Sequence, residues 1–281
     1  MNLILIAVVS LGSIGLVSAV VLYVASKKFA VYEDPRIGQV AEALPQANCG
    51  GCGYPGCSGF AAACVKAGSL EGKLCPVGGQ ATMEKVAAIL GLEAVAAEPR
   101  VAVVRCNGTC ANRPRLTEYD GVRSCAVAHS TYGGETGCTS GCLGCGDCAE
   151  ACQFGGIRMN PETGLPEVDE DLCTACGACA AACPRNIIEL RPRGKNNRRV
   201  YVGCVNKDKG AVARKACAVA CIGCGKCVKV CPFDAVTVEN NLAYIDPAKC
   251  KSCRKCEMEC PQGAIVAVNF PPRKVKAEAE N

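Results

Sequence analysis

Four runs of cysteines are the residues of this chain whose type and spacing are best suited to chemistry. Each run follows the pattern C-x2-C-x2-C-x3-C, which is typical of Cys thiolates that hold a [4Fe–4S] cube. Two intervening residues let a tight loop present three sulfurs to adjacent iron corners. The pattern therefore predicts four cubes. The four runs are Cys142, Cys145, Cys148 and Cys152; Cys173, Cys176, Cys179 and Cys183; Cys221, Cys224, Cys227 and Cys231; and Cys250, Cys253, Cys256 and Cys260.

The fourth ligand of each cube is expected to come from the neighbouring run, as it does in two-cluster ferredoxins. Proline follows Cys183, Cys231 and Cys260, as a ferredoxin run requires, whereas Gln153 follows Cys152 and makes that run slightly atypical. The rule predicts four quartets. They are Cys142, Cys145, Cys148 and Cys183; Cys173, Cys176, Cys179 and Cys152; Cys221, Cys224, Cys227 and Cys260; and Cys250, Cys253, Cys256 and Cys231.

The cysteine pattern occurs twice, which indicates an internal duplication. Six cysteines recur after 79 positions: Cys125, Cys138, Cys142, Cys145, Cys148 and Cys152 correspond to Cys204, Cys217, Cys221, Cys224, Cys227 and Cys231. The two copies predict ferredoxin-like domains at 138–191 and 217–270, each with two cubes. Apolar segments predict flanking strands at 157–159, 187–190, 236–238 and 265–268, and helices are expected at 149–152, at 180–183 and at their later equivalents.

A different cysteine site is expected in a small helical module at 33–91. Cys49, Cys52, Cys57 and Cys75 follow the spacing C-x2-C-x4-C-x17-C, within a Gly-rich loop whose small residues let backbone amides approach a cluster. These four cysteines predict a fifth cube. Cys64 lies in the predicted helix 59–67 and is expected to be a small buried apolar residue. The G-x-G-x-x-G in this loop follows no strand and contains Pro55, so we expect no NAD or flavin on this chain.

Six further cysteines remain after five cubes are assigned: Cys106, Cys110, Cys125, Cys138, Cys204 and Cys217. They allow a sixth cube, for example from Cys106, Cys110, Cys125 and Cys138, but the duplication repeats only Cys125 and Cys138 of that set. The alternative is that they are free structural thiols. The segment 100–137, which begins with a predicted strand at 101–104, is expected to connect the helical module to the first ferredoxin-like domain.

Composition excludes several alternatives. The 27 cysteines among 281 residues would indicate a disulfide scaffold in a short secreted chain, but clustered C-x2-C runs suit metal instead. Zinc ribbons use such spacing too, although not in four registered runs. The single histidine, His129, excludes Rieske-type ligation, which needs two. The formal charge is +5, and five cubes at about −2 each would reverse its sign.

Residues 1–26 are expected to form a transmembrane anchor. The run from Leu3 to Ala25 has no charge and is long enough to cross a bilayer as a helix. A cleaved signal peptide is the alternative, but a basic n-region is absent and the apolar run is too long. Lys27 and Lys28 follow at once and predict a cytoplasmic C-terminal side, in agreement with the reducing compartment that clusters need. The sequence thus predicts a single-pass protein of the inner (plasma) membrane.

Two basic segments have alternative interpretations. The connector 192–216 begins within a run from Arg191 to Arg199 that contains five basic residues. A solvated hairpin is one interpretation, and a docking patch for an acidic electron carrier is the other, because opposite charge speeds encounter. A second candidate patch comprises Lys249, Lys251, Arg254 and Lys255. The tail 271–281 is charged and polar, so we expect it to be disordered. Nothing in these segments predicts a nucleic-acid partner.

The chain resembles the B subunits of the Rnf complex, the ion-translocating ferredoxin:NAD oxidoreductase of bacterial membranes. The resemblance lies in the N-terminal anchor, in N-C-G-G-C-G-Y-P-G-C at 48–57, in C-P-V-G-G at 75–79, and in the runs at 141–148 and 214–227. It spans nearly the whole chain. The second ferredoxin copy is similar to the extended form of some members.

The resemblance implies an α+β protein with an N-terminal transmembrane helix, a small helical [4Fe–4S] module and tandem two-cluster ferredoxin-like domains. It also implies an electron-transfer subunit with at least five cubes and without a substrate-converting site. Soluble reduced ferredoxin would be the donor, and other subunits of the membrane complex would be the partners, with transfer coupled to Na⁺ or H⁺ export. The alternatives are the iron–sulfur subunit of a membrane hydrogenase or formate dehydrogenase, a membrane-tethered redox sensor, and a zinc or iron-storage protein.

Overall fold

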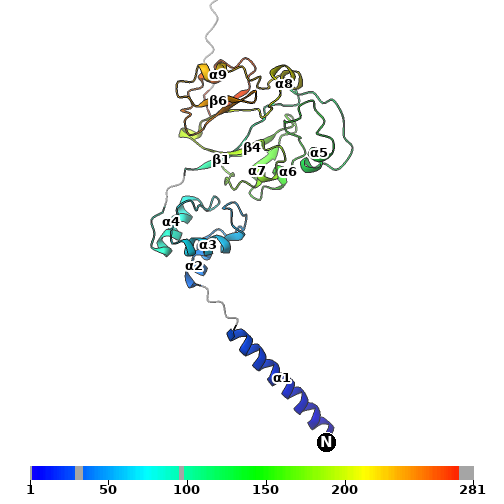
Figure 1. Ribbon diagram of the computed structural model, residues 1–281, viewed down its shortest axis with the longest axis vertical. Helices are drawn as coiled ribbons and strands as arrows, with labels where there is room; N and C mark the ends of the chain where they lie inside the picture. The colour runs from blue at the N-terminus through cyan, green and yellow to red at the C-terminus, as the bar shows by residue number, and fades with distance from the viewer. Residues whose placement is uncertain (1, 29–33, 95–97, 272–281) are drawn as a thin grey trace, which may run out of the picture.

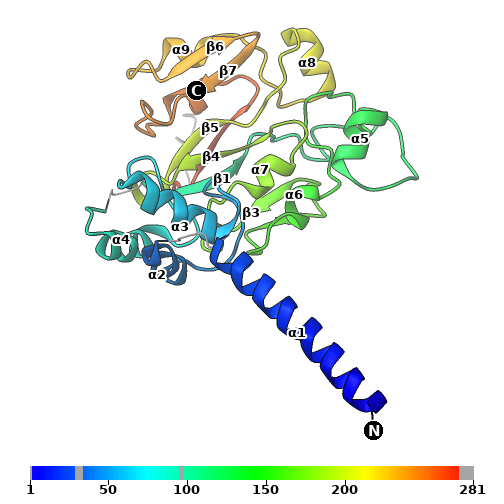
Figure 2. The same cartoon turned by 60° about the horizontal axis from the view of Figure 1, so that its bottom comes forward.

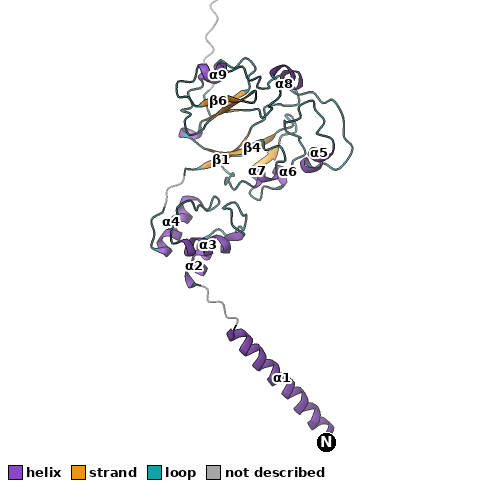
Figure 3. Ribbon diagram, viewed as in Figure 1, coloured by secondary structure: helices purple, strands orange, loops and turns teal. Residues whose placement is uncertain are grey.

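The computed structural model describes residues 2–28, 34–94 and 98–271 of the 281 (Figure 1). The longer helices lie in the N-terminal part, whereas short strands, short helices and loops make up the rest (Figure 3). This mixture of helices and small sheets agrees with the α+β class predicted from the sequence. Apart from Pro271, the predicted tail lies outside the described residues.

Helix α1, Asn2–Lys28, stands away from the rest of the molecule (Figures 1 and 2). Leu11, Leu16 and Leu22 are exposed at 70%, 68% and 68%, so the helix has no apolar partner in the described part of the chain. Within the described residues it is the one helix long and apolar enough to cross a membrane, over Leu11–Lys28. Length and composition therefore agree with the predicted anchor.

Three helices form the N-terminal module: α2, Pro35–Ala43; α3, Gly56–Ala67; and α4, Gly79–Leu90. Asp34 caps α2, because its carboxylate accepts a hydrogen bond from the Arg36 backbone N–H at 2.9 Å. Val40, Phe60 and Val86 are at most 1% exposed and pack into one core with Met83. This core fixes the loop at 44–55, which holds the first cysteines of the module.

The ferredoxin-like part repeats one plan twice. In each copy a long-range antiparallel pair is accompanied by a local hairpin, and helices of four or five residues follow the cysteine loops. The first copy pairs β1, Arg100–Val104, with β4, Ile188–Pro192, and β2, Ile157–Met159, with β3, Pro166–Val168. The second copy pairs β5, Arg199–Val202, with β8, Ile265–Val268, and β6, Val236–Glu239, with β7, Leu242–Ile245.

Short helices complete each copy. The first copy has α5, Cys125–Thr131; α6, Asp147–Glu150; and α7, Ala178–Ala182. The second has α8, Gly210–Ala216; α9, Lys226–Lys229; and α10, Lys255–Met258, and the 3₁₀ turn η1, Lys195–Asn197, precedes β5. Helices α6 and α7 begin two residues before the predicted positions. Gly146 and Gly177, with φ of 100° and 86°, turn the chain directly into them.

In each copy, the first strand of the long-range pair (β1 or β5) lies before the residue range predicted for its ferredoxin-like domain. Strand β1 belongs to the segment expected to be a connecting region, yet Val101 pairs with Arg191. Strand β5 lies in the expected connector, and all four of its residues are buried. The last strand of a ferredoxin-like unit needs a partner for its edge, and the apolar segment before the unit supplies it. The domain bounds themselves stay a prediction.

Candidate iron–sulfur sites

Three of the five predicted quartets each line a small cavity. Cys49, Cys52, Cys57 and Cys75 surround one in the helical module. In the second ferredoxin copy, Cys221, Cys224, Cys227 and Cys260 surround another, and Cys231, Cys250, Cys253 and Cys256 surround a third. Two of these cavities include a cysteine from the neighbouring run, so the structure brings together the crosswise groups expected from the spacing rule.

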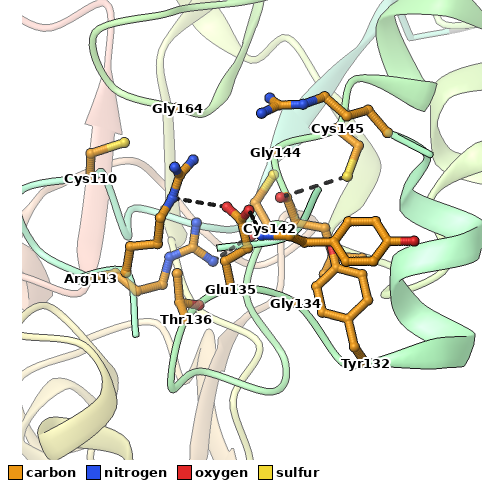
Figure 4. Close-up of a pocket in the computed structure, with 14 residues that line it drawn as sticks. Cys110, Arg113, Tyr132, Gly134, Glu135, Thr136, Cys142, Gly144, Cys145 and Gly164 are labelled. Atoms are coloured by element: carbon orange, nitrogen blue, oxygen red, sulfur yellow. Dashed lines mark hydrogen bonds and ion pairs between the residues drawn. The ribbon is translucent and has the colours of Figure 1, made fainter. Parts of the chain in front are cut away.

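The first ferredoxin copy groups its thiols in a related way. Cys142, Cys148 and Cys183 line a common cavity, where Cys125 lies in place of Cys145. Cys145 instead faces a larger cavity of about 320 Å³ shown in Figure 4, and the Cys125 and Cys145 side chains are hydrogen-bonded. The other quartet also assembles. Burial and then the charges of Cys173, Cys176 and Cys152 raise the pKa of Cys179 to about 11.

Burial dominates the electrostatics of these thiols. It raises the pKa of Cys142, Cys148 and Cys256 to about 12, and neighbouring cysteine charges add to the effect. A thiol with such a pKa is protonated at neutral pH, so cluster assembly must displace its proton. A positively charged iron–sulfur core supplies the compensation that an isolated buried thiolate lacks.

Backbone N–H groups point at several of the sulfurs. The N–H of Gly78 donates to Cys75 Sγ at 3.3 Å, and the N–H of Ala264 donates to Cys260 Sγ at the same distance. Ala243 and Ser252 donate to the sulfurs of Cys221 and Cys250, each at 3.4 Å. Such donors stabilise thiolate charge and tune the reduction potential of a bound cluster.

All 27 cysteines lie within the described residues, and all are free thiols. This contradicts a disulfide scaffold. Within the same residues, no group of three or more His, Cys, Asp or Glu side chains is arranged to hold a metal ion, and this includes the four-cysteine runs. Thiolates of a tetrahedral zinc site lie about 4 Å apart, given Zn–S bonds near 2.3 Å. A four-iron cube spaces its thiolates further apart than a single ion does.

The six leftover cysteines differ in their surroundings. Cys110 is exposed and lies beside Gly164, where an added Cβ would be 2.7 Å from its Sγ. Cys125 lies against Cys145, as described above. Cys106 and Cys125 both lie near Cys142, and Cys110 lines a cavity with it. Cys106 and Cys138 also lie near Cys217.

The two ends of the run from Arg191 to Arg199 are buried, whereas Lys195 at its turn is exposed. Arg191 and Arg199 are 2% and 6% exposed. Arg191 pairs with Glu189, and Arg199 pairs with Glu170. Arg193 donates to the backbone carbonyls of Glu170 and Cys173. The structure thus corrects both interpretations for Arg191, Arg193 and Arg199, because β4 and β5 bring these arginines against Glu189 on β4 and against the segment that begins the second cysteine run.

The second basic segment is exposed where the first is not. Lys249, Lys251 and Lys255 are exposed around the exposed Cys253, whereas Arg254 pairs with Glu257 at 2.7 Å. Cys224 is exposed as well. The second ferredoxin copy therefore presents one expected ligand of each of its predicted cubes at the surface. The Cys253 edge has a rim of positive charge, here named the lysine rim (Lys249, Lys251 and Lys255).

The helical module touches the first ferredoxin copy at a cysteine loop. A Cβ added to Gly51 would lie 2.6 Å from the Cys176 carbonyl oxygen and 2.9 Å from its Cα. Gly51 lies between two expected ligands of the module cube, and Cys176 is an expected ligand of the nearest ferredoxin cube. Glycine is therefore required here for close approach, and two predicted cubes face each other across this contact.

Two family models match the chain. Residues 141–187, 172–235 and 220–264 match a 4Fe-4S dicluster domain, and residues 44–77 match a putative Fe-S cluster domain. These ranges contain all five predicted quartets. The comparison therefore agrees with the two kinds of cysteine site described above.

Curated relatives extend the similarity over most of the chain. The B subunit of the Na(+)-translocating ferredoxin:NAD(+) oxidoreductase complex of Acetobacterium woodii is 49% identical over 251 residues, which cover 89% of this chain and 74% of the relative. Its counterpart in the proton-translocating complex of Clostridium ljungdahlii is 43% identical over 90% of this chain and 87% of its own length. The chain belongs to this B-subunit family. The corresponding protein of the ion-translocating oxidoreductase complex of Methanosarcina acetivorans is 42% identical, over 91% of this chain and 95% of the relative.

Membership in the B-subunit family agrees with the resemblance seen in the sequence. It identifies the chain as an electron-transfer subunit of an oxidoreductase and decides against an origin in a hydrogenase or formate dehydrogenase. The buried Arg113 was not singled out by sequence reasoning, yet it lies between the cysteine loops (Figure 4). Its only sequence signal is a position three residues after Cys110.

Proposed function

We propose that this protein accepts electrons from reduced soluble ferredoxin and relays them, one at a time, through at least five [4Fe–4S] cubes toward the membrane subunits of its complex. The observation that carries the proposal is the series of cysteine quartets, three of which each surround a cavity. All-thiolate cubes reach the low potentials that ferredoxin oxidation needs. Each predicted quartet supplies four thiolates to one cube, and no NAD or flavin is expected on this chain.

The route that we propose begins at the second ferredoxin copy. The lysine rim surrounds an exposed ligand there, so an acidic donor would approach along a favourable field and meet a cube with little protein in between. The route ends at the helical module, which contacts the first copy through Gly51 and follows the anchor in the chain (Figure 1). Ferredoxin-like domains on the cytoplasmic side would follow from Lys27 and Lys28 at the end of a single membrane-spanning α1.

The relatives' names fit this assignment. They are B subunits of Na(+)- and proton-translocating ferredoxin:NAD(+) oxidoreductase complexes, so transfer through this chain is proposed to be coupled to export of one of these ions by other subunits. The chain then serves as the electron-input part of a translocase and does not itself convert a substrate.

Anaerobic titration of the full-length chain in detergent with reduced ferredoxin tests the relay. We expect at least five electrons to be accepted per chain, because each cube takes one. Acceptance of two or fewer would exclude a relay and favour a sensor with one labile cluster.

Charge reversal tests the docking site. Lys251→Glu combined with Lys255→Glu should slow ferredoxin-dependent reduction at low salt and lose this effect at high salt, since exposed charges are screened beyond about 10 Å at 0.1 M. Lys85→Glu with Lys66→Glu, at exposed positions of the helical module, makes the same charge change away from the rim. Equal rates for the two double variants at low salt would remove the lysine rim from the proposal.

A further inference from the structure

Four cysteines outside the runs meet where the two ferredoxin copies join. They come from three segments of the chain: Cys106 follows β1, Cys138 precedes the first run, and Cys204 and Cys217 lie on either side of α8. Cys138, Cys204 and Cys217 are 6%, 9% and 7% exposed. Packing alone does not explain three buried cysteines at one junction, because a small apolar residue such as alanine would fill each position.

Contacts with two glycines show how closely the thiols gather. A Cβ on Gly108 would lie 3.2 Å from Cys217 Sγ, and a Cβ on Gly141 would lie 3.2 Å from Cys138 Sγ. The same two positions would meet the Arg113 side chain, at 3.5 Å and 2.8 Å. Cys217 and Cys138 therefore flank one guanidinium.

Cys106 and Cys204 complete the group. The Cys142 N–H donates to Cys106 Sγ at 3.4 Å, next to Gly141. Burial and then the charges of Cys106 and Cys138 raise the pKa of Cys217. Burial likewise raises the pKa of Cys204, to about 11, with smaller contributions from the charges of Cys221 and Cys138. Backbone geometry joins the same residues, because an added Cβ on Gly203, next to Cys204, would lie 3.1 Å from the Cβ of Asn107, next to Cys106.

A buried cation beside Cys138 and Cys217 is only partly hydrogen-bonded. Arg113 is 7% exposed, and one of its terminal nitrogens donates to the Cys142 carbonyl oxygen. Its Nε is buried and has no hydrogen-bond partner among the described residues. Burying an uncompensated guanidinium is costly, so an anion beside it would remove the cost. Cys138 and Cys217 are the members of the group beside Arg113 that could hold such an anion.

A buried amide also points at the group. Asn206 is 1% exposed, and its Nδ2 donates to Cys138 Sγ at 3.7 Å while its Oδ1 accepts from the Asp208 N–H at 2.7 Å. An amide held in this way is a typical donor to a cluster-bound thiolate. Backbone hydrogen bonds fix the surrounding loops, because the Asn107 N–H donates to the Gly203 carbonyl at 2.9 Å.

We propose that Cys106, Cys138, Cys204 and Cys217 ligate a sixth [4Fe–4S] cube that bridges the two ferredoxin copies. The four thiols lose four protons to solvent and bind a core of charge +2, which gives a net charge of −2 and leaves iron and sulfide oxidation states unchanged. The adjacent Arg113 offsets part of this charge. The register of the duplication conceals the site, because Cys204 and Cys217 are equivalent to Cys125 and Cys138, of which only Cys138 takes part.

The position of this cube gives it a role in the proposed relay. Cys106 contacts the backbone of Cys142, a ligand expected for a cube of the first copy, and Cys204 lies beside Cys221, a ligand expected for a cube of the second. A cube at the junction lies between these two and carries electrons from one copy to the other. This role rests on the proposed function, whereas the existence of the cube does not.

The test is iron and acid-labile sulfide analysis of the anaerobically purified full-length chain, with native mass spectrometry of the same samples. We expect about 24 iron ions per wild-type chain. Cys217→Ala should lose one sixth of the iron and sulfide and a mass of roughly 350 Da, which is one cube. Cys64→Ala, which removes an equally buried thiol from helix α3, should keep all of it.

Several outcomes would overturn the sixth cube. These are a wild-type mass that fits only five cubes, a Cys217→Ala variant with the wild-type iron content, or loss of one zinc ion in place of four irons. If Cys217→Ala does not accumulate, the wild-type mass still decides between five and six. A five-cube result combined with acceptance of five electrons from ferredoxin would reject the bridging cube and leave the proposed relay intact.

Discussion

Replacing Gly51 with alanine should separate the helical module from the ferredoxin-like part without unfolding either. Gly51 does not have a left-handed φ, so alanine is compatible with its backbone. The new Cβ would nevertheless lie 2.6 Å from the Cys176 carbonyl oxygen and 2.9 Å from the Cys176 Cα and Cβ. All three atoms belong to a tight cysteine loop that cannot rotate away as the end of a long side chain can.

The size of the effect follows from these distances. Ordinary contact begins at 3.4 Å, so the module must shift by roughly 0.8 Å relative to Cys176. Overpacking of this kind costs about 1–3 kcal/mol. If the whole cost falls on the contact between module and ferredoxin copy, the docked population falls about 5- to 150-fold relative to the undocked one. Both cubes keep their ligands, so the iron content should not change.

Electron paramagnetic resonance of the fully reduced full-length chain measures this contact. In the wild-type chain the module cube and the Cys176 cube should interact magnetically, and in Gly51→Ala this splitting should diminish. Rapid-freeze samples taken after mixing with reduced ferredoxin should also show later reduction of the module cube. Gly38→Ala is the matched control, because a Cβ on Gly38 in α2 meets nothing within 4 Å.

An unchanged splitting in Gly51→Ala, with iron content equal to wild type, would refute the reasoning. It would mean that the contact between Gly51 and Cys176 does not hold the two cubes together. A splitting lost in Gly38→Ala as well would show that the signal reports general loosening of the module. Either result would mean that the contact between Gly51 and Cys176 does not hold the two cubes in position for electron transfer.

Two other perturbations have defined outcomes. Glu189→Gln leaves the buried Arg105 and Arg191 without their carboxylate, so the free energy of unfolding in anaerobic urea titration should fall by about 3–5 kcal/mol, whereas Glu167→Gln at an exposed pair should change it by less than about 1 kcal/mol. Burial raises the pKa of Cys142, Cys148 and Cys256 to about 12 in the cluster-free chain, so each thiol must release a proton on loading. Iron loading against a fixed chelator should therefore increase as pH rises from about 7 to about 9, and loading that falls with pH would contradict this.

Residue spacing predicted three cysteine quartets that each line a cavity, because most of their members are local in the sequence. Three of every ferredoxin quartet lie within one tight loop, and the fourth follows a rule that does not depend on the rest of the fold. The strands at 157–159 and 265–268 were predicted at their observed bounds, since each is a short apolar segment between turns.

Long-range pairing is what the sequence did not reveal. The partner of β4 lies about 90 residues earlier in β1, and no local pattern encodes that distance. The same limit explains the arginines between Arg191 and Arg199. Their spacing is that of an exposed basic run, but the strands that contain them place Glu170 and Glu189 against them. Burial decided their role, and burial is a property of the assembled sheets.

The leftover cysteines show a related limit. Cys106, Cys138 and Cys217 come from three segments that only the packing of both copies brings together, so neither spacing nor repeat register could group them. Cys110 and Cys125 looked equivalent to them by type and spacing. Cys110 is exposed and Cys125 is hydrogen-bonded to Cys145, and these features appear only in the folded chain.

The exposure of Cys224 and Cys253 should make the second ferredoxin copy sensitive to air. Dioxygen reaches a cube most easily where a ligand lies at the surface, whereas the buried Cys142 and Cys148 are shielded. Damage in air should therefore begin at the second ferredoxin copy. A sample that has lost only part of its colour would then retain the cubes of the first copy. It would already have lost the cubes at which electrons are proposed to enter.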